Sequence, residues 1–169
     1  MQVKARGADG GHARSMSTHR RMLIVVADGE HARFVRAAAD GALHTVSAID
    51  STAARKQSSG LGSDRPGATF HSDASVHHSL SPRSDPHMLA EERFAQMLAR
   101  EIGITMDHDP AGELVLAAPP RILNAIRERL ADGIAARIVG MLGKDLTKVP
   151  DQALRSHLRH WLDAPPRTS

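Results

Sequence analysis

The apolar run Met22–Ala27, Met-Leu-Ile-Val-Val-Ala, constrains the fold of this chain more than any other segment. A strand with one solvated face alternates apolar and polar side chains, whereas this run has no polar face. Short continuous apolar runs that end at a turn are typical of strands buried on both faces. The run therefore predicts a central strand in a sheet that carries helices on its faces.

Two turn dipeptides predict an antiparallel meander around this strand. Asp28-Gly29 follows the run, and Asp40-Gly41 comes 12 residues later. Asp-Gly pairs between apolar segments are typical of hairpin turns. Residues 32–37 and 43–49 alternate side chains on two faces, as strands do. We expect three antiparallel strands in this part of the chain.

The second half predicts helices that alternate with two strands. A helix capped by Asp85, with Pro86 at its first position, is expected to end at Gly103. Then come a strand at 113–118, a helix that begins at Pro119-Pro120, a strand at 135–142 and a helix led by Pro150. The order β-β-β-α-β-α-β-α, with a right-handed parallel crossover, predicts an α/β fold. It is the order of the ribonuclease H-like fold, with a mixed five-stranded sheet.

Length and charge suggest one domain with two tails. We expect a single domain over residues 22–163 and a C-terminal tail over 164–169. Residues 1–21 hold five Lys or Arg against one Asp and little to bury, so we expect a disordered basic tail, with Met16 or Met22 as alternative starts. Residues 121–169 carry a net charge of +4. Basic segments of this kind either meet phosphates or form solvated faces.

Composition excludes several classes of site. The chain has no cysteine, which excludes disulfides and thiolate chemistry and suits a reducing cytoplasm. Its apolar runs are far shorter than a membrane span, and no secretory segment precedes the first strand. We expect a cytoplasmic protein with no membrane partner and no cofactor, and the oligomeric state stays open.

The polar segment 57–87 is the candidate site. Segments of this length without apolar periodicity are functional or disordered. Arg65 and Arg83 lie near its two ends, and each either locks the loop through a carboxylate or clamps a phosphate. The residues expected to structure the loop are Asp64, Pro66, Gly67, Asp85 and Pro86. His71, Asp73, His77 and His78 could bind zinc or nickel, but their spacing matches no metal-site rule and exposed loop histidines are the alternative.

The carboxylates do not form the pattern of a two-metal nuclease. Such enzymes need acidic side chains that converge from the first strand, the first helix and the end of the fourth strand. Here the fourth strand ends in Ala117-Ala118-Pro119, Asp28 fits a turn, and Glu91 and Glu92 fit the start of a helix. No catalytic residue is assigned, and the sequence favours a protein that is not an enzyme.

Five groups of motifs follow one another along the chain: Val26-Ala27-Asp28-Gly29 with Ala32-Arg33-Phe34; Ser63-Asp64-Arg65-Pro66-Gly67 with Phe70; Pro82-Arg83-Ser84-Asp85-Pro86-His87 with Glu92-Arg93-Phe94-Ala95; Leu114 to Arg121; and Lys144-Asp145-Leu146-Thr147. In this order they resemble the bacterial "protein required for attachment to host cells" family, over about residues 22–162. That family is similar to the middle domain of archaeo-eukaryotic peptide-chain release factors. The resemblance implies a ribosome- or tRNA-associated module. The catalytic Gly-Gly-Gln of release factors is missing, since Gln57 and Gly60-Leu61-Gly62 stand in its place.

We therefore expect a release-factor-like module that binds RNA phosphates. The chain has only three Phe, one Trp and no Tyr, too few to build a stacking platform for bases. Binding would be electrostatic, through Arg65, Arg83, His87, Arg121 and Lys144 at loops near the strand ends. One alternative is a non-enzymatic regulatory or interaction protein that affects attachment to host cells. The other is a metal-dependent hydrolase that uses the loop histidines.

Overall fold

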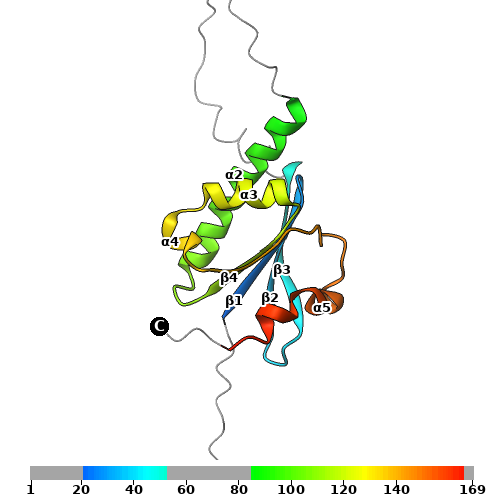
Figure 1. Cartoon of the computed structure of the whole chain (residues 1–169), viewed down its shortest axis with the longest axis vertical. Helices are drawn as coiled ribbons and strands as arrows, with labels where there is room; N and C mark the ends of the chain where they lie inside the picture. The colour runs from blue at the N-terminus through cyan, green and yellow to red at the C-terminus, as the bar shows by residue number, and fades with distance from the viewer. Residues whose placement is uncertain (1–20, 53–84, 166–169) are drawn as a thin grey trace, which may run out of the picture.

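The computed structural model describes residues 21–52 and 85–165 (Figure 1). The elements follow in the order β1 (Met22–Ala27), β2 (His31–Ala37), β3 (Leu43–Asp50), α2 (Pro86–Asp107), β4 (Glu113–Ala117), α3 (Pro120–Arg129), α4 (Asp132–Ala135), β5 (Ile138–Leu142) and α5 (Asp151–Leu162). Within these two ranges, none of the helices combines the length and the apolar character that a membrane crossing requires.

The strands form one mixed five-stranded sheet in the order β3-β2-β1-β4-β5. β1 pairs antiparallel with β2, and β2 with β3, as the two turn dipeptides predict. β1 pairs parallel with β4, and β4 with β5, so the carboxyl ends of these three strands lie at one edge of the sheet. The predicted α/β fold with a mixed five-stranded sheet is confirmed.

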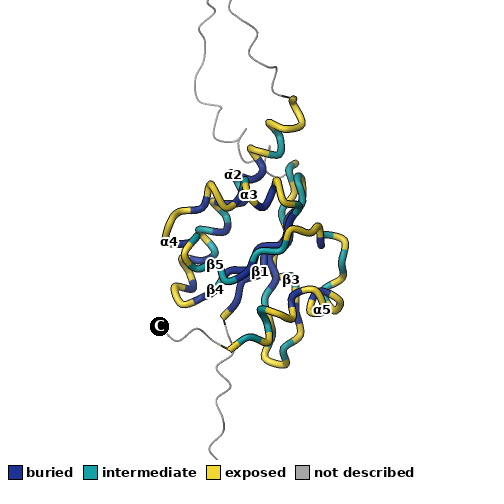
Figure 2. Tube along the Cα trace, in the orientation of Figure 1, coloured by how far each residue is buried: buried dark blue, intermediate teal, exposed yellow. Residues whose placement is uncertain are grey.

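The core has two layers, one on each face of the sheet. Every residue of β1 is buried (Figure 2). The side chains of β1 alternate between the two layers. The α2 and α3 layer includes Leu23, Val25, Phe94, Leu98, Ile122 and Ile126. The α5 layer includes Ile24, Val26, Val115, Leu154 and Leu158. The first apolar run is thus a strand covered on both faces, as predicted, because helices pack on each side of it.

The sequence predicted that helix α2 ends at Gly103, and this prediction is wrong. The helix continues to Asp107. Leu98, Ile102 and Met106 are all buried and lie four residues apart, so the apolar stripe of the helix runs past the glycine. A Cβ built at Gly103 meets no atom within 4 Å. Glycine here is tolerated on an open part of the helix surface and does not act as a cap.

The predicted strand at 135–142 is too long at its start. Residues 132–135 form the short helix α4, and β5 begins only at Ile138. The amides of Ile134 and Ala135 donate to the carbonyl of Ala131 at 2.9 Å, which holds a helical turn. The buried Ile134 belongs to the α2 and α3 layer, so packing favours the helical turn there.

Polar contacts fix the start of α5 to β2 and β3. Asp151, the first residue of α5, accepts hydrogen bonds from Arg33 of β2 at 2.9 Å and from the backbone N–H of Thr45 of β3 at 2.6 Å. Its pKa lies below the usual value: burial works to raise it, but the hydrogen bonds from the side chain and backbone of Thr45 and the charge of Arg33 outweigh that effect. At the other end of α5, the indole of Trp161 lies over Gly140 of β5, where a Cβ would come within 2.5 Å of the ring.

Candidate functional site

Loops and helix starts gather at the carboxyl ends of β1, β4 and β5. The turn at Asp28-Gly29 follows β1, the start of α3 follows β4, and the segment 143–149 follows β5. The first turns of α2 lie beside them. We use the name strand-end rim for these residues of this edge: Asp28, Gly29, His87, Glu91, Arg121, Lys144 and Thr147. Ligands of open α/β sheets bind at this edge.

Asp28 closes the turn after β1. Its Oδ1 accepts hydrogen bonds from the backbone N–H groups of Glu30, at 2.7 Å, and of His31, at 2.6 Å. The ring of His31 lies 3.3 Å from Oδ2. Burial works to raise the pKa of Asp28, but these two backbone hydrogen bonds and the nearby charge of His31 keep it below its usual value. The negative charge of Asp28 is therefore largely satisfied by its own turn.

Thr147 connects this turn to the segment after β5. Its hydroxyl donates to Oδ1 of Asp145 at 2.6 Å and lies 3.4 Å from Oδ2 of Asp28. The backbone N–H of Thr147 also donates to Asp145, at 2.8 Å. A hydroxyl has a single hydrogen to donate, so the shorter contact takes it. The contact with Asp28 is then a long one, which brings the two segments together without a strong bond.

Glu91 of α2 connects the turn after β1 with the start of α3. Its Oε2 lies 3.1 Å from Nη1 of Arg121, and its Oε1 lies 3.4 Å from Nε2 of His87. A Cβ at Gly29 would come within 3.0 Å of Cγ and Oε1 of Glu91. The carboxylate thus packs against the backbone of the turn, in space that the missing Cβ of glycine leaves free.

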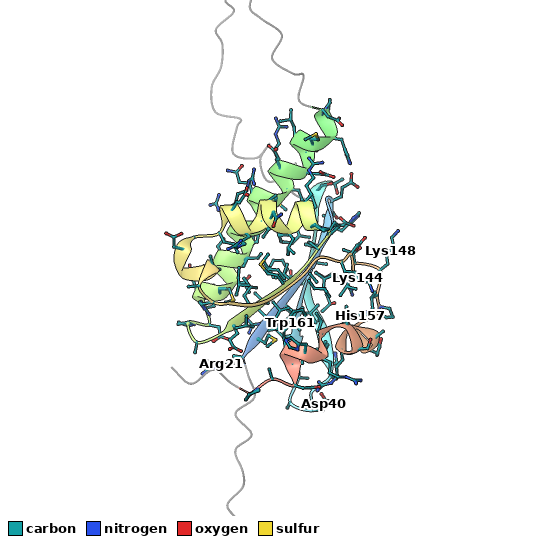
Figure 3. All side chains as sticks on the ribbon, viewed as in Figure 1. Arg21, Asp40, Lys144, Lys148, His157 and Trp161 are labelled. Carbon is teal, nitrogen blue, oxygen red and sulfur yellow. The ribbon has the colours of Figure 1, made fainter. Side chains whose placement is uncertain are left out.

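Lys144 lies next to the start of α3. A Cβ on the preceding Gly143 would be 3.4 Å from Cγ of Pro120, so the segment after β5 and the first residue of α3 are in contact. Lys144 and Arg121 flank this contact. Both are exposed, and Figure 3 shows Lys144 and Lys148 pointing outward on the same side of the molecule. Arg121 and Lys144 thus lie in the same part of the rim.

Three of the five residues predicted to bind anions are therefore in the rim. His87 and Arg121 are joined through Glu91, and Lys144 lies across the Pro120 contact. Asp85 accepts a hydrogen bond from the backbone N–H of His87 at 3.0 Å, and Pro86 is the first residue of α2. The other predicted residues lie outside the described ranges: Arg65, Arg83, Asp64, Pro66 and Gly67, and the candidate metal ligands His71, Asp73, His77 and His78.

Sequence reasoning missed the place of Glu91. It grouped Glu91 with Glu92 as carboxylates that suit the start of a helix, but Glu91 packs into the rim while Glu92 is exposed. The available signal was the spacing of four residues between His87 and Glu91, which puts both on one face of a helix. In residues 21–52 and 85–165, no three His, Cys, Asp or Glu side chains are grouped so that they could hold a metal ion.

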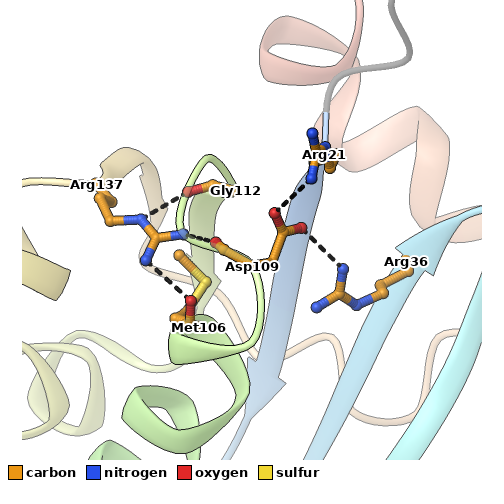
Figure 4. A network of polar contacts seen from close by, with 6 residues as sticks. All are labelled: Arg21, Arg36, Met106, Asp109, Gly112 and Arg137. Carbon is orange, nitrogen blue, oxygen red and sulfur yellow. Dashed lines mark hydrogen bonds and ion pairs between the residues drawn. The ribbon is translucent and has the colours of Figure 1, made fainter.

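A second polar network lies at the opposite edge of the sheet (Figure 4). Asp109, which is 8% exposed, accepts from Arg21 at 3.3 Å and from Arg36 at 3.4 Å. The side chain of Arg137 donates to the carbonyl groups of Met106, Asp109 and Gly112. Every one of these arginines bonds to the protein itself, so this network fixes the loop between α2 and β4 to β1, β2 and β5.

The comparisons with known proteins agree with the extent of this fold. A family model described as "Protein required for attachment to host cells" matches residues 23–158, which run from β1 into α5. Among curated proteins, none matches the chain.

Proposed function

The chain belongs to the family of proteins required for attachment to host cells, and from this premise we propose that it is a phosphate-binding module that contacts RNA through the strand-end rim. The family match confirms the resemblance that the sequence motifs indicate. The similarity to the middle domain of release factors stays a prediction. Release factors act on the ribosome, so this similarity favours the ribosome or tRNA as the partner and the cytoplasm as the location.

The observation that carries the proposal is the arrangement of charge across the rim. The acidic groups are covered or satisfied: the side chain of Glu91 is 17% exposed, and Asp28 bonds to the backbone of its own turn. The basic groups face solvent: the side chain of Arg121 is 51% exposed, and Lys144 is exposed. Among the rim residues, an approaching polyanion therefore meets guanidinium and ammonium groups first, while the exposed Asp145 beside Lys144 accepts two hydrogen bonds from Thr147. Arginine and lysine are the side chains that most often contact phosphates.

The place of these cations also supports the proposal. Arg121 is the second residue of α3, and no side chain caps the start of this helix. Pro119 and Pro120 have no N–H, so it is the later amides of this first turn, beginning with that of Arg121, that favour a nearby anion and add to the effect of the side chain. Lys144 follows β5 at the same sheet edge. Electrostatic contacts of this kind position an RNA backbone and do not read its sequence.

Salt dependence tests the proposal directly. We expect the whole chain to bind single-stranded RNA with an affinity that falls steeply between low and high salt. In the double variant Arg121→Ala/Lys144→Ala, two phosphate contacts are removed, so the slope of log K against log salt should become shallower by about 1.4. Fluorescence anisotropy with a labelled oligonucleotide measures both quantities.

The matched control is Arg129→Ala/Arg159→Ala. It removes the same charge from exposed positions at the far ends of α3 and α5. We expect it to change the slope far less than the rim variant does. If both double variants change the slope equally, RNA binding depends on the net charge of the protein and not on the rim. If the affinity of the wild type does not change with salt, phosphate binding is excluded.

The family description favours a second candidate, an interaction protein that acts in attachment to host cells without catalysis. Capture from a cell lysate separates the two. Enrichment of ribosomes or tRNA, reduced in the rim variant, supports the first. Enrichment of proteins alone, unchanged in the rim variant, supports the second. The metal-dependent hydrolase stays a prediction, since its histidines lie outside the described residues.

A further inference from the structure

We propose that Glu91 is a resident counter-anion of Arg121, which competes with phosphate for the guanidinium and so lowers the affinity of the rim for RNA. The inference rests on the proposed function, because it concerns the same cations. It adds a regulatory contact: the free protein keeps its anion-binding arginine occupied by a carboxylate of its own.

The position of the carboxylate supports this role. Glu91 contacts two of the three described residues that are predicted to bind anions, Arg121 through Oε2 at 3.1 Å and His87 through Oε1 at 3.4 Å. The backbone of Gly29 supports it from the sheet side. The carboxylate thus lies between the two cationic or ionisable groups, where a phosphate that engages both would place its own oxygens.

The geometry of the Glu91–Arg121 ion pair allows a phosphate to replace the carboxylate as the partner of the guanidinium. Oε2 of Glu91 is buried, yet among the described residues it accepts no hydrogen bond with good geometry, although Nη1 of Arg121 is close. Paired arginine and carboxylate groups are strongest when two parallel hydrogen bonds join them. This pair lacks that geometry, so the guanidinium keeps donors that are open to an incoming anion.

The electrostatics set the direction of the effect. A phosphate bound on the exposed side of Arg121 lies within a few ångströms of the carboxylate of Glu91, and the two negative charges repel. The carboxylate is mostly buried, so water screens this repulsion less than at an open surface. Removal of the charge should raise the affinity of the rim for phosphate by about tenfold.

The test compares Glu91→Gln with Glu92→Gln. Both remove one carboxylate from neighbouring positions of α2, but only Glu91 pairs with Arg121. Glu91→Met is a second uncharged variant of similar length, and circular dichroism establishes that each variant is folded. Inorganic phosphate is the first probe, followed through the NMR signal of the side-chain Nε–H of Arg121, which Arg121→Lys identifies. A single-stranded oligonucleotide is the second probe.

We expect phosphate to shift the Arg121 signal at about tenfold lower concentration in the folded Glu91 variants than in the wild type, with Glu92→Gln close to the wild type. A response of Glu91→Gln and Glu91→Met that equals that of Glu92→Gln, or that is weaker than the wild type, overturns the inference, as does loss of fold in both Glu91 variants, since Glu91 would then be structural.

The two probes separate this inference from the proposed function. If phosphate binds more tightly to the Glu91 variants but the oligonucleotide binds to none, the counter-anion stands and RNA is the wrong ligand. If the oligonucleotide binds the wild type with the expected salt dependence and the Glu91 variants gain nothing, the proposed function stands and the counter-anion is wrong.

Discussion

At the scale of single residues, three carboxylates join segments that are distant in the sequence through ion pairs and hydrogen bonds. Asp109 joins the strands at one edge of the sheet, Asp151 attaches α5 to β2 and β3, and Glu91 joins α2 to α3. Each is largely shielded from water and lies against at least one arginine. Charged hydrogen bonds in such places are stronger than neutral ones, and the loss of one partner leaves the other uncompensated.

Asp151→Asn is expected to destabilise the protein by about 2 kcal/mol, because it removes the charge that Arg33 pairs with. The pKa of Asp151 is lower in the folded protein than in the unfolded chain. Its contribution is therefore present above the unfolded pKa of about 3.9 and is lost as the pH falls through the lower folded pKa.

Urea unfolding at pH 7 and at a series of acidic pH values measures this effect. The difference in unfolding free energy between wild type and Asp151→Asn should shrink as the pH falls below about 4. Asp132→Asn, an exposed acid at the start of α4, is the control and should show a small difference throughout. A constant gap down to the lowest pH would mean that the charge of Asp151 does not contribute.

At the scale of elements, glycine has different roles in α2 and β5. Gly103 lies within α2 with open space around it, while Gly140 in β5 lies directly under the indole of Trp161. The first position permits a side chain. The second depends on its absence, because α5 packs against the strand through that contact.

Gly103→Ala should stabilise the protein by about 0.5 to 1 kcal/mol, since alanine favours the helix and meets no atom. Gly140→Ala should destabilise it by about 1 to 3 kcal/mol, since the methyl group forces the indole away. Thermal unfolding followed by circular dichroism gives both values. The chain has one Trp, so a change in its fluorescence in Gly140→Ala alone would report displacement of Trp161. A stabilised Gly140→Ala would contradict the packing of α5 described above.

At the scale of the whole molecule, charged side chains gather at two places on the sheet, the network around Asp109 and the strand-end rim. At the edge around Asp109, Arg36 and Arg137 are partly buried and bond to the protein itself, and the more exposed Arg21 pairs with Asp109. At the strand-end rim, Lys144 is exposed, and Arg121 pairs with Glu91 but keeps about half of its side chain in solvent. Between them, β1 is covered on both faces and β3 forms an exposed border of the sheet, with a largely open burial pattern. Stability is therefore concentrated in the middle of the sheet.

Native-state hydrogen exchange should reflect this distribution. We expect the amides of β1 and β4 to exchange only through global unfolding, because helices cover them on both sides. The outer amides of β3 and the first turn of α2, which is exposed, should exchange through local opening. Exchange of β3 as slow as that of β1 would show that something further covers this border.

Much of this fold is encoded in local patterns. The unbroken apolar run of β1 indicates a strand with two covered faces, and Asp28-Gly29 and Asp40-Gly41 indicate the two hairpins. Such features depend on near neighbours in the chain, so the sequence by itself determined the three antiparallel strands, β4 and the helix starts at Pro86 and Pro120. The start of β5 and the short helix α4 before it did not follow from local pattern. The end of α2 was predicted wrongly because packing of Met106 outweighs the local cost of Gly103.

Only the tertiary structure decided which charged groups meet. Arg36 and Asp109 are 73 residues apart in the sequence, and no local pattern relates them. In the same way, the helix pattern of α2 places Glu91 on a face but does not reveal that Arg121 lies opposite or that Gly29 leaves room for the carboxylate. Periodicity fixes the direction of a side chain relative to its own element, whereas its partner depends on how separate elements pack. The rim and its internal counter-anion therefore arise from packing.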